Sequence, residues 1–232
     1  MQIKQAITMM ASEKIKSKIK GKSIKKSISD MFDDIPKSLS EHGVHYFNDQ
    51  VDDVSTGEAI TFILEANLNP ECNWKYITLI INSPGGFCSD GFALIDIMLG
   101  SRIPIHTVGI GMIASMGLQI FLTGEKGYRT LTPNCMILSH QYAGFAIGKE
   151  HELVASQKEF GILTEMVMRH YRRTTGLTEE EIREYLLPAE DRWLTAKEAK
   201  KYGICDTVKD LKPSHIKASL INKKKKTKTK AK

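Results

Sequence analysis

Ser115 stands among small residues, at a place where a serine can act as a nucleophile. The surrounding segment, residues 111–117, reads Gly-Met-Ile-Ala-Ser-Met-Gly, and an apolar stretch with helical spacing follows it. A Ser at a strand-to-helix turn exposes its hydroxyl at a helix N-terminus, where free backbone N–H groups favour developing negative charge. The same place suits an ordinary helix N-cap, and the spacing differs from the G-x-S-x-G turn. Ser115 therefore indicates catalysis only together with other groups.

A pair of glycines, Gly85 and Gly86, follows Ser83-Pro84 and ends the apolar stretch 76–81. Glycines let the backbone turn sharply and present N–H groups that no side chain covers. Such donors stabilise the oxyanion that forms when a nucleophile attacks a carbonyl, and losing one typically costs about 3 kcal/mol of barrier. A plain turn is the alternative interpretation of this segment.

His140 directly follows the apolar stretch 135–138, and an imidazole near a Ser hydroxyl can act as its general base. Asp191 lies in a loop before the last helix-like stretch, and a carboxylate beside the base would fix its tautomer. Spacing alone does not separate Asp191 from Glu190 or Asp206. These residues together predict an α/β hydrolytic enzyme.

Alternating strand-like and helix-like stretches must position these groups. Residues 109–114 are expected to form a small-residue turn. Capping-box patterns, Thr-x-x-Glu, start at Thr178 and Thr195. Repeated β-then-α units imply an α/β domain with a largely parallel sheet. The expected strands are 44–47, 76–81, 103–108 and 135–139, and the expected helices are 56–67, 92–99, 116–122, 150–173, 178–185 and 195–201.

Length and composition indicate one domain with tails. The chain has 232 residues, 41% of them hydrophobic, which is enough for one sizeable core. No run approaches the roughly 18 apolar residues of a membrane span, and no secretory signal is visible, so we expect no membrane partner. The four cysteines form no CxxC pair, which argues against a metal site or a disulfide framework. This usage suits a reducing compartment and predicts a cytoplasmic location.

The formal charge of +6 is unevenly distributed along the chain. Residues 1–30 carry +6 and residues 209–232 carry +9, so residues 31–208 carry −9. We therefore predict a basic, flexible extension over 1–40, a globular domain over 41–208 and a disordered Lys-rich tail over 209–232. An acidic globular part does not suit nucleic-acid binding.

Four segments in chain order resemble the Clp protease proteolytic subunit family. The resemblance runs from about residue 44 to 208, with 29 residues from Gly86 to Ser115 and 25 from Ser115 to His140. These spacings are those expected of the family. The segments are the glycine-rich 81–86, the nucleophile motif 114–117, the histidine strand 133–141 and the acidic region 190–206.

The resemblance implies a spiral of ββα units, shared with the crotonases, and a protruding handle made of a strand and a long helix. It implies a serine endopeptidase that needs no metal. Ser115 would attack the peptide bond, His140 would move the proton, and Asp191 would orient His140. The N–H groups of Gly86 and Met116 would hold the oxyanion.

The resemblance also implies that the segments at Gly85 and Gly144 contact the substrate backbone. Two stacked heptameric rings of this chain would enclose a chamber, and an AAA+ unfoldase would use ATP to feed it unfolded polypeptide. The chain itself would bind no cofactor. One departure from the family is Tyr142, which stands where a Pro usually follows His-Gln.

Three alternatives stay open. The first is a specialised processing protease, such as a phage capsid-maturation peptidase, which needs no unfoldase. The second is a non-catalytic ring subunit, although the Ser, His and Asp candidates are all retained. The third is a crotonase-like acyl-CoA enzyme, which would not need this set of residues. For the N-terminal extension, an organellar transit segment is the alternative to a cytoplasmic location.

Overall fold

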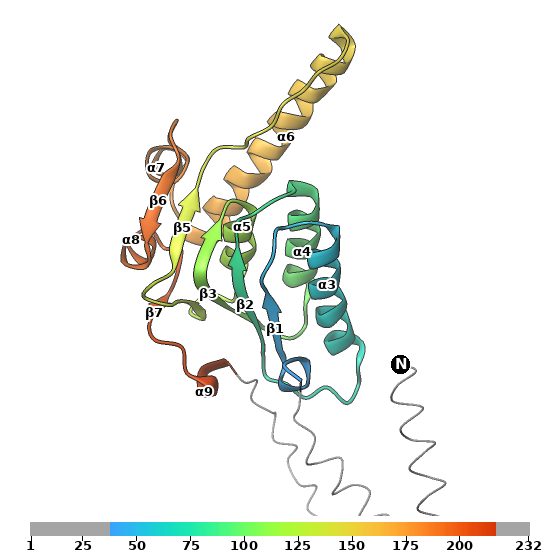
Figure 1. Cartoon of the computed structure of the whole chain (residues 1–232), viewed down its shortest axis with the longest axis vertical. Coiled ribbons are helices and arrows are strands. Elements are labelled where there is room, and N and C mark those ends of the chain that lie inside the picture. The colour runs from blue at the N-terminus through green and yellow to red at the C-terminus, as the bar shows by residue number, and fades with distance from the viewer. Residues whose placement is uncertain (1–37, 217–232) are drawn as a thin grey trace, which may run out of the picture. The chain divides into compact units, whose positions relative to one another are not determined.

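A computed structural model describes residues 38–216 of the chain (Figure 1). The predicted basic extension, 1–40, lies almost entirely outside these residues. The first part of the predicted tail, residues 209–216, is described and contains a short helix. No helix within residues 38–216 combines the length and the apolar character that crossing a membrane requires.

Strands and helices alternate along the described residues, as the sequence predicts. The elements are η1 (Ser40–His42), β1 (Val44–Phe47), α3 (Asp53–Leu68), β2 (Ile77–Ser83), α4 (Cys88–Gly100), β3 (Ile105–Ala114), α5 (Met116–Leu122), β4 (Arg129–Leu131), β5 (Met136–Ser139), α6 (Glu150–Thr175), α7 (Glu179–Tyr185), β6 (Arg192–Thr195), α8 (Ala196–Lys201), β7 (Thr207–Val208) and α9 (Pro213–Ile216).

The seven strands form one sheet that is parallel except at one ladder. The strand order is β1-β2-β3-β4-β7, while β5 pairs with β3 and antiparallel β6 pairs with β5. On one side, the long strand β3 pairs with two different strands. Its first half pairs with β4, and its last three residues pair with β5. Figure 1 shows the resulting fan of strands beside α3, α4 and α5. This mixed α/β architecture agrees with the predicted fold class.

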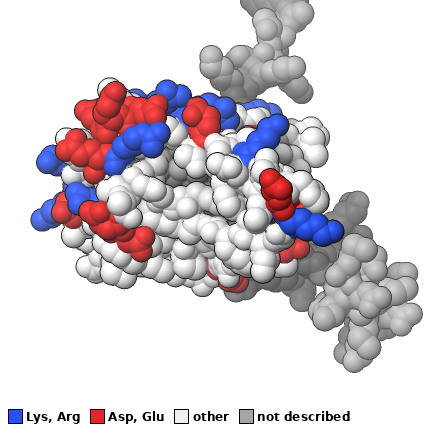
Figure 2. All heavy atoms as spheres, turned by 90° about the horizontal axis from the view of Figure 1, so that it is seen from above, with Lys and Arg blue, Asp and Glu red and all other residues white. Residues whose placement is uncertain are grey.

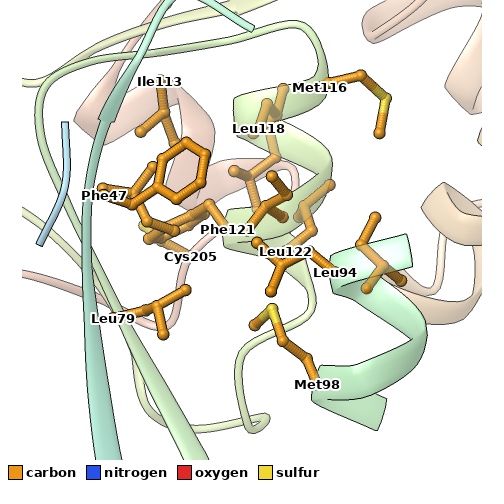
Figure 3. Close-up of a cluster of buried hydrophobic side chains, with 14 of the residues drawn as sticks. Phe47, Leu79, Leu94, Met98, Ile113, Met116, Leu118, Phe121, Leu122 and Cys205 are labelled. Atoms are coloured by element: carbon orange, nitrogen blue, oxygen red, sulfur yellow. The ribbon is translucent and has the colours of Figure 1, made fainter. Parts of the chain in front are cut away.

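The main hydrophobic core fills the space between the sheet and these helices. Strand side chains alternate between the two faces, so Leu79 and Ile81 of β2 join the main core whereas Ile80 joins a small cluster on the other face. Figure 3 shows the α5 side chains Leu118, Phe121 and Leu122 at the centre of the core. Fully burying one such side chain contributes about 1.5–3 kcal/mol. The core therefore anchors the helix that follows Ser115.

The helix starts follow from local capping. Thr178 accepts a hydrogen bond from the Glu181 N–H, and Thr195 accepts one from the Glu198 N–H. Both capping boxes predicted from the sequence are confirmed.

Residues 109–114 correct one prediction, because they form the second half of β3 and not a turn. Gly111 adopts φ 57°, and a Cβ there would lie 2.6 Å from the Asn82 side-chain oxygen. That oxygen accepts the Met112 N–H at 3.0 Å, where the β2–β3 register shifts. The small residues thus accommodate an irregularity within a strand, which the composition alone cannot distinguish from a turn.

Helix α6 extends away from the sheet in Figure 1. Its 26 residues correspond to a length of about 39 Å. The buried residues of this helix, Met168, His170 and Tyr171, all lie near its C-terminal end. The predicted long helix of the handle is therefore present. Residues 141–149 before it form no ladder with other described residues, and a strand is recognised only when it has a hydrogen-bonded neighbour.

A buried ion pair ties the far edge of the sheet to the end of α6. Arg129 contacts both carboxylate oxygens of Asp206, at 3.0 and 2.8 Å, and donates to the Thr174 carbonyl. Burial alone would raise the pKa of Asp206, but the Arg129 hydrogen bonds outweigh this effect and lower it. Asp206 is therefore committed to a structural role.

Candidate active site

Among the described residues, Ser115 is the one non-glycine residue with a positive φ. Its φ is 53° and its ψ is −122°, at the junction of β3 and α5. Such a conformation costs on the order of 1–3 kcal/mol and persists only where the surroundings enforce it. The Ser115 N–H donates to the Leu138 carbonyl at 3.0 Å, which fixes the turn against β5. The side chain is half-buried, so the hydroxyl is presented and not enclosed.

Gly85 packs directly behind this turn. Its φ is 92°, and a Cβ at this position would lie 2.5 Å from the Ser115 Cβ and 2.8 Å from the Ala114 carbonyl oxygen. Both close atoms belong to the nucleophile turn, and one of them is backbone. Only glycine therefore allows the glycine-rich segment to lie against Ser115.

For the peptidase chemistry that the family resemblance implies, we expect Gly85→Ala to lower turnover by about 100-fold, because displacing Ser115 by even 1 Å has an effect of that size. The matched control is Gly57→Ala in α3, where an added Cβ meets nothing within 4 Å. Turnover of a fluorogenic peptide by both variants, at equal protein concentration, checks this. Equal turnover by Gly85→Ala and Gly57→Ala would contradict the packing argument.

The backbone N–H of Gly86 faces away from Val51, the residue with which Gly86 forms a β-bridge. The Val51 N–H donates to the Gly85 carbonyl and the Phe87 N–H donates to the Val51 carbonyl, both at 2.8 Å. This parallel bridge uses the groups flanking Gly86, so the N–H of Gly86 itself points to the opposite side. A side chain at Gly86 would collide with the Val51 carbonyl oxygen, 2.2 Å from the added Cβ. The glycine is thus required for the close approach.

One cavity of about 570 Å³ brings most of the predicted site residues together. Ser115, His140, Gly86, Met116 and Gly144 all line it. The N–H of Met116 is the first of α5, where no earlier helical carbonyl is available to accept it. The serine, the histidine and the two residues proposed as N–H donors thus line one cavity.

The segment bearing His140 is fixed on both sides. Ser139, directly before it, hydrogen-bonds the Leu186 carbonyl. Gln141, directly after it, donates its side-chain N–H₂ to the Leu187 and Pro188 carbonyls at 3.1 and 3.0 Å. His140 therefore lies against the segment that leads to Asp191. Within residues 38–216, no hydrogen bond joins His140 to Ser115 or to Asp191.

Asp191 is exposed and does not line the cavity. The antiparallel β5–β6 ladder ends with Ser139 opposite Arg192. His140 directly follows this last pair on one strand and Asp191 directly precedes it on the other, so the ladder brings their backbones close in space. Asp206 lies on β7's side of the sheet and is bound by Arg129. Of the acids that the sequence leaves open, Asp191 is therefore favoured by position over Asp206.

Several residues of the site carry no strong sequence signal. Gln119 lines the cavity one helical turn after Ser115, on the same face of α5. Tyr171 of α6 also lines it, although it is 31 residues beyond His140. The i, i+4 relation to Ser115 could have indicated Gln119; no local pattern indicates Tyr171. The part of the chain that the structure describes contains no group of three or more His, Cys, Asp or Glu placed to hold a metal ion.

His170, the most buried histidine described, is not a second base. Its ring contacts the Gln119 carbonyl at 3.0 Å and the Thr123 hydroxyl at 3.2 Å. Burial lowers the pKa of His170 to about 4, so the ring is neutral at neutral pH. It supports the C-terminal part of α5 and does not line the cavity.

The fold and the site together define an α/β protein with a candidate nucleophilic serine at a strained strand-to-helix turn. Residues 27–212 match the family model described as Clp protease, so the chain belongs to the Clp protease family. It is 33% identical over 177 residues to the ATP-dependent Clp protease proteolytic subunit 3, chloroplastic, of Arabidopsis thaliana. That alignment covers 76% of this chain and 56% of the relative, so this chain spans little more than half of that relative's length.

Proposed function

We propose that this chain is the proteolytic subunit of an ATP-dependent Clp protease, a serine endopeptidase that hydrolyses unfolded polypeptides. The observation that carries the proposal is Ser115, held at positive φ at the start of α5 in a cavity that His140 and Gly86 also line. A strained nucleophile turn is maintained only where the surrounding structure enforces it, and such strain clusters at active sites. Family membership supports the same class of chemistry.

The proposed reaction uses groups of this chain and water. The Ser115 hydroxyl attacks the peptide carbonyl while His140 accepts its proton, which forms a tetrahedral intermediate. The N–H groups of Gly86 and Met116 bind the oxyanion. His140 then protonates the leaving amine, and water hydrolyses the acyl-enzyme by the same path in reverse. Asp191 orients the His140 ring and stabilises its charged form.

The cavity favours recognition of the polypeptide backbone over recognition of charge. Glu159 is the one Asp, Glu, Lys or Arg side chain among the described residues that line it. Figure 2 shows that the face seen from above has a broad uncharged area in its middle, with charged side chains gathered mainly to one side. Extended chains bind by adding backbone hydrogen bonds to a strand edge. In this proposal the segments at Gly85 and Gly144 supply those bonds.

The handle suggests how copies of this chain assemble. Large apolar side chains are exposed on α6 and the segment before it, where Phe145 and Ile147 are 89% and 90% exposed. Exposed apolar surface of this kind marks an interaction site. We propose that these residues pack against a second copy, within two stacked heptameric rings. The relative's name, an ATP-dependent proteolytic subunit, supports an AAA+ unfoldase as the partner that uses ATP.

The same relative bears on location. Its name places it in chloroplasts, which favours the organellar alternative over the cytoplasmic location predicted from cysteine usage. The extension that would serve as a transit segment, residues 1–37, lies outside the described residues.

Unfoldase dependence separates this proposal from a processing protease. We expect a folded, tagged substrate to be degraded only when an AAA+ Clp unfoldase and ATP are both present, because a folded chain does not enter an enclosed chamber. A short peptide should be cleaved without either. Omitting ATP is the internal control, and native mass spectrometry reports the ring and the bound unfoldase. Cleavage of one specific structural protein without an unfoldase would favour the processing protease.

A further inference from the structure

A chain of buried polar side chains runs beneath the cavity. The Tyr171 hydroxyl lies 2.6 Å from the Ser139 hydroxyl, and Ser139 also contacts the Leu186 carbonyl. The Gln119 side chain lines the same cavity as Tyr171. All three side chains are almost fully buried: Ser139 is 0%, Tyr171 1% and Gln119 3% exposed. Buried polar groups of this kind are costly to leave unpaired, so the network has one favoured arrangement.

Each hydrogen bond of this network has one possible donor and one possible acceptor. A carbonyl oxygen can only accept, so the Ser139 hydroxyl donates to Leu186. Ser139 has no second proton, so the Tyr171 hydroxyl donates to Ser139. Burial raises the pKa of Tyr171 to about 12, which keeps its proton in place at neutral pH.

The network joins the base of α6 to two segments that carry proposed catalytic residues. Ser139 immediately precedes His140, and Leu186 begins the segment that leads to Asp191. Tyr171 comes from the base of α6 and hydrogen-bonds the Ser139 hydroxyl. Each hydrogen bond spans at least 32 residues of sequence, so the network fixes tertiary and not local geometry.

We propose that the Tyr171 hydroxyl is a positioning group for catalysis, which acts through Ser139 to hold His140 at a fixed distance from Ser115. Gln141 ties the other side of His140 to the same segment, so Tyr171 and Gln141 together restrict its backbone. The inference rests on the proposed peptidase function and adds a residue that does not itself touch the reacting atoms.

The test compares two variants that each remove one oxygen atom, Tyr171→Phe and Ser139→Ala. In the assembled protein from size-exclusion chromatography, we expect kcat for a fluorogenic peptide to fall by about 10- to 100-fold. KM should stay within about twofold, because the substrate contacts are unchanged. The double variant should be no slower than the slower single variant, since both interrupt the same network.

Thr107→Val is the matched control. It also removes a buried hydroxyl, one that donates to the Phe121 carbonyl at 2.8 Å, near the other end of α5. We expect its melting temperature to fall while kcat stays within about twofold of wild type. A Tyr171→Phe kcat within that range, or multiplying losses in the double variant, would overturn the proposal.

Fluorophosphonate labelling distinguishes this failure from failure of the proposed function. If wild type is labelled at Ser115 and Tyr171→Phe turns over normally, only the positioning role is wrong. If wild type neither labels nor hydrolyses peptides in the assembled state, both the peptidase function and the positioning role are wrong.

Discussion

Ser115→Ala is expected to abolish fluorophosphonate labelling and to lower peptidase turnover by roughly 10⁵- to 10⁶-fold, as removal of a triad nucleophile does. The reagent phosphonylates a serine only when the hydroxyl is activated and the oxyanion has donors. Ser115 is the residue at the strained turn between β3 and α5, beside the N–H groups of Gly86 and Met116. Labelling followed by peptide mass spectrometry identifies the modified residue.

The control for this prediction is Ser89→Ala. Ser89 is an exposed serine that lines the same cavity, and its hydroxyl contacts the neighbouring Asp90 carboxylate at 3.3 Å. It has an ordinary helical conformation in α4, so its removal should leave labelling intact. If Ser115→Ala were labelled as wild type is, the nucleophile assignment would fail and the non-catalytic subunit would become the better interpretation.

Local signals explain why much of the fold could be predicted from the sequence. Helix α5 begins and ends where the apolar spacing places it, and both Thr-x-x-Glu patterns start helices. Capping and periodicity act within one or two helical turns, so one stretch of sequence contains the whole signal. The parallel sheet follows from the alternation of such stretches.

The elements that were missed depend on distant partners. Strand β6, Arg192–Thr195, is absent from the strands that the sequence predicts, because its hydrogen bonds come from β5, more than fifty residues earlier. Strands β4 and β7 pair with one another in the same non-local way. The glycines of 109–114 suggest a turn, yet pairing with the neighbouring strands keeps this segment within β3, with an irregularity at Gly111. In each case, tertiary pairing overrides local preference.

The residues of the candidate site also differ in whether local sequence signals could reveal them. Ser115, Gly86 and His140 could be proposed from residue type and spacing, and one cavity contains all three. Spacing alone left Asp191, Glu190 and Asp206 open, and the resemblance pointed to Asp191. The Arg129 ion pair, which no spacing reveals, gives Asp206 a different partner.

The second large effect is expected at His140, where His140→Ala should lower turnover by roughly 10⁵- to 10⁶-fold. Without an imidazole, the Ser115 hydroxyl has no base to accept its proton and the leaving amine has no acid. Peptide turnover by assembled rings, with size-exclusion chromatography as a check on assembly, measures this. His106→Ala is the control, because the His106 ring is stacked between Tyr76 and Tyr128 near the opposite end of β3.

The double variant Ser115→Ala/His140→Ala gives the sharper result. Groups that act as one unit are strongly non-additive, so the double variant should be no slower than Ser115→Ala alone. Independent contributions would instead multiply to a loss of about 10¹⁰-fold or more, below any measurable turnover. Near-normal turnover of His140→Ala in assembled rings would refute His140 as the base. Because Ser139 and Gln141 hold the backbone at this position, loss of the imidazole should remove the proton acceptor without displacing the strand.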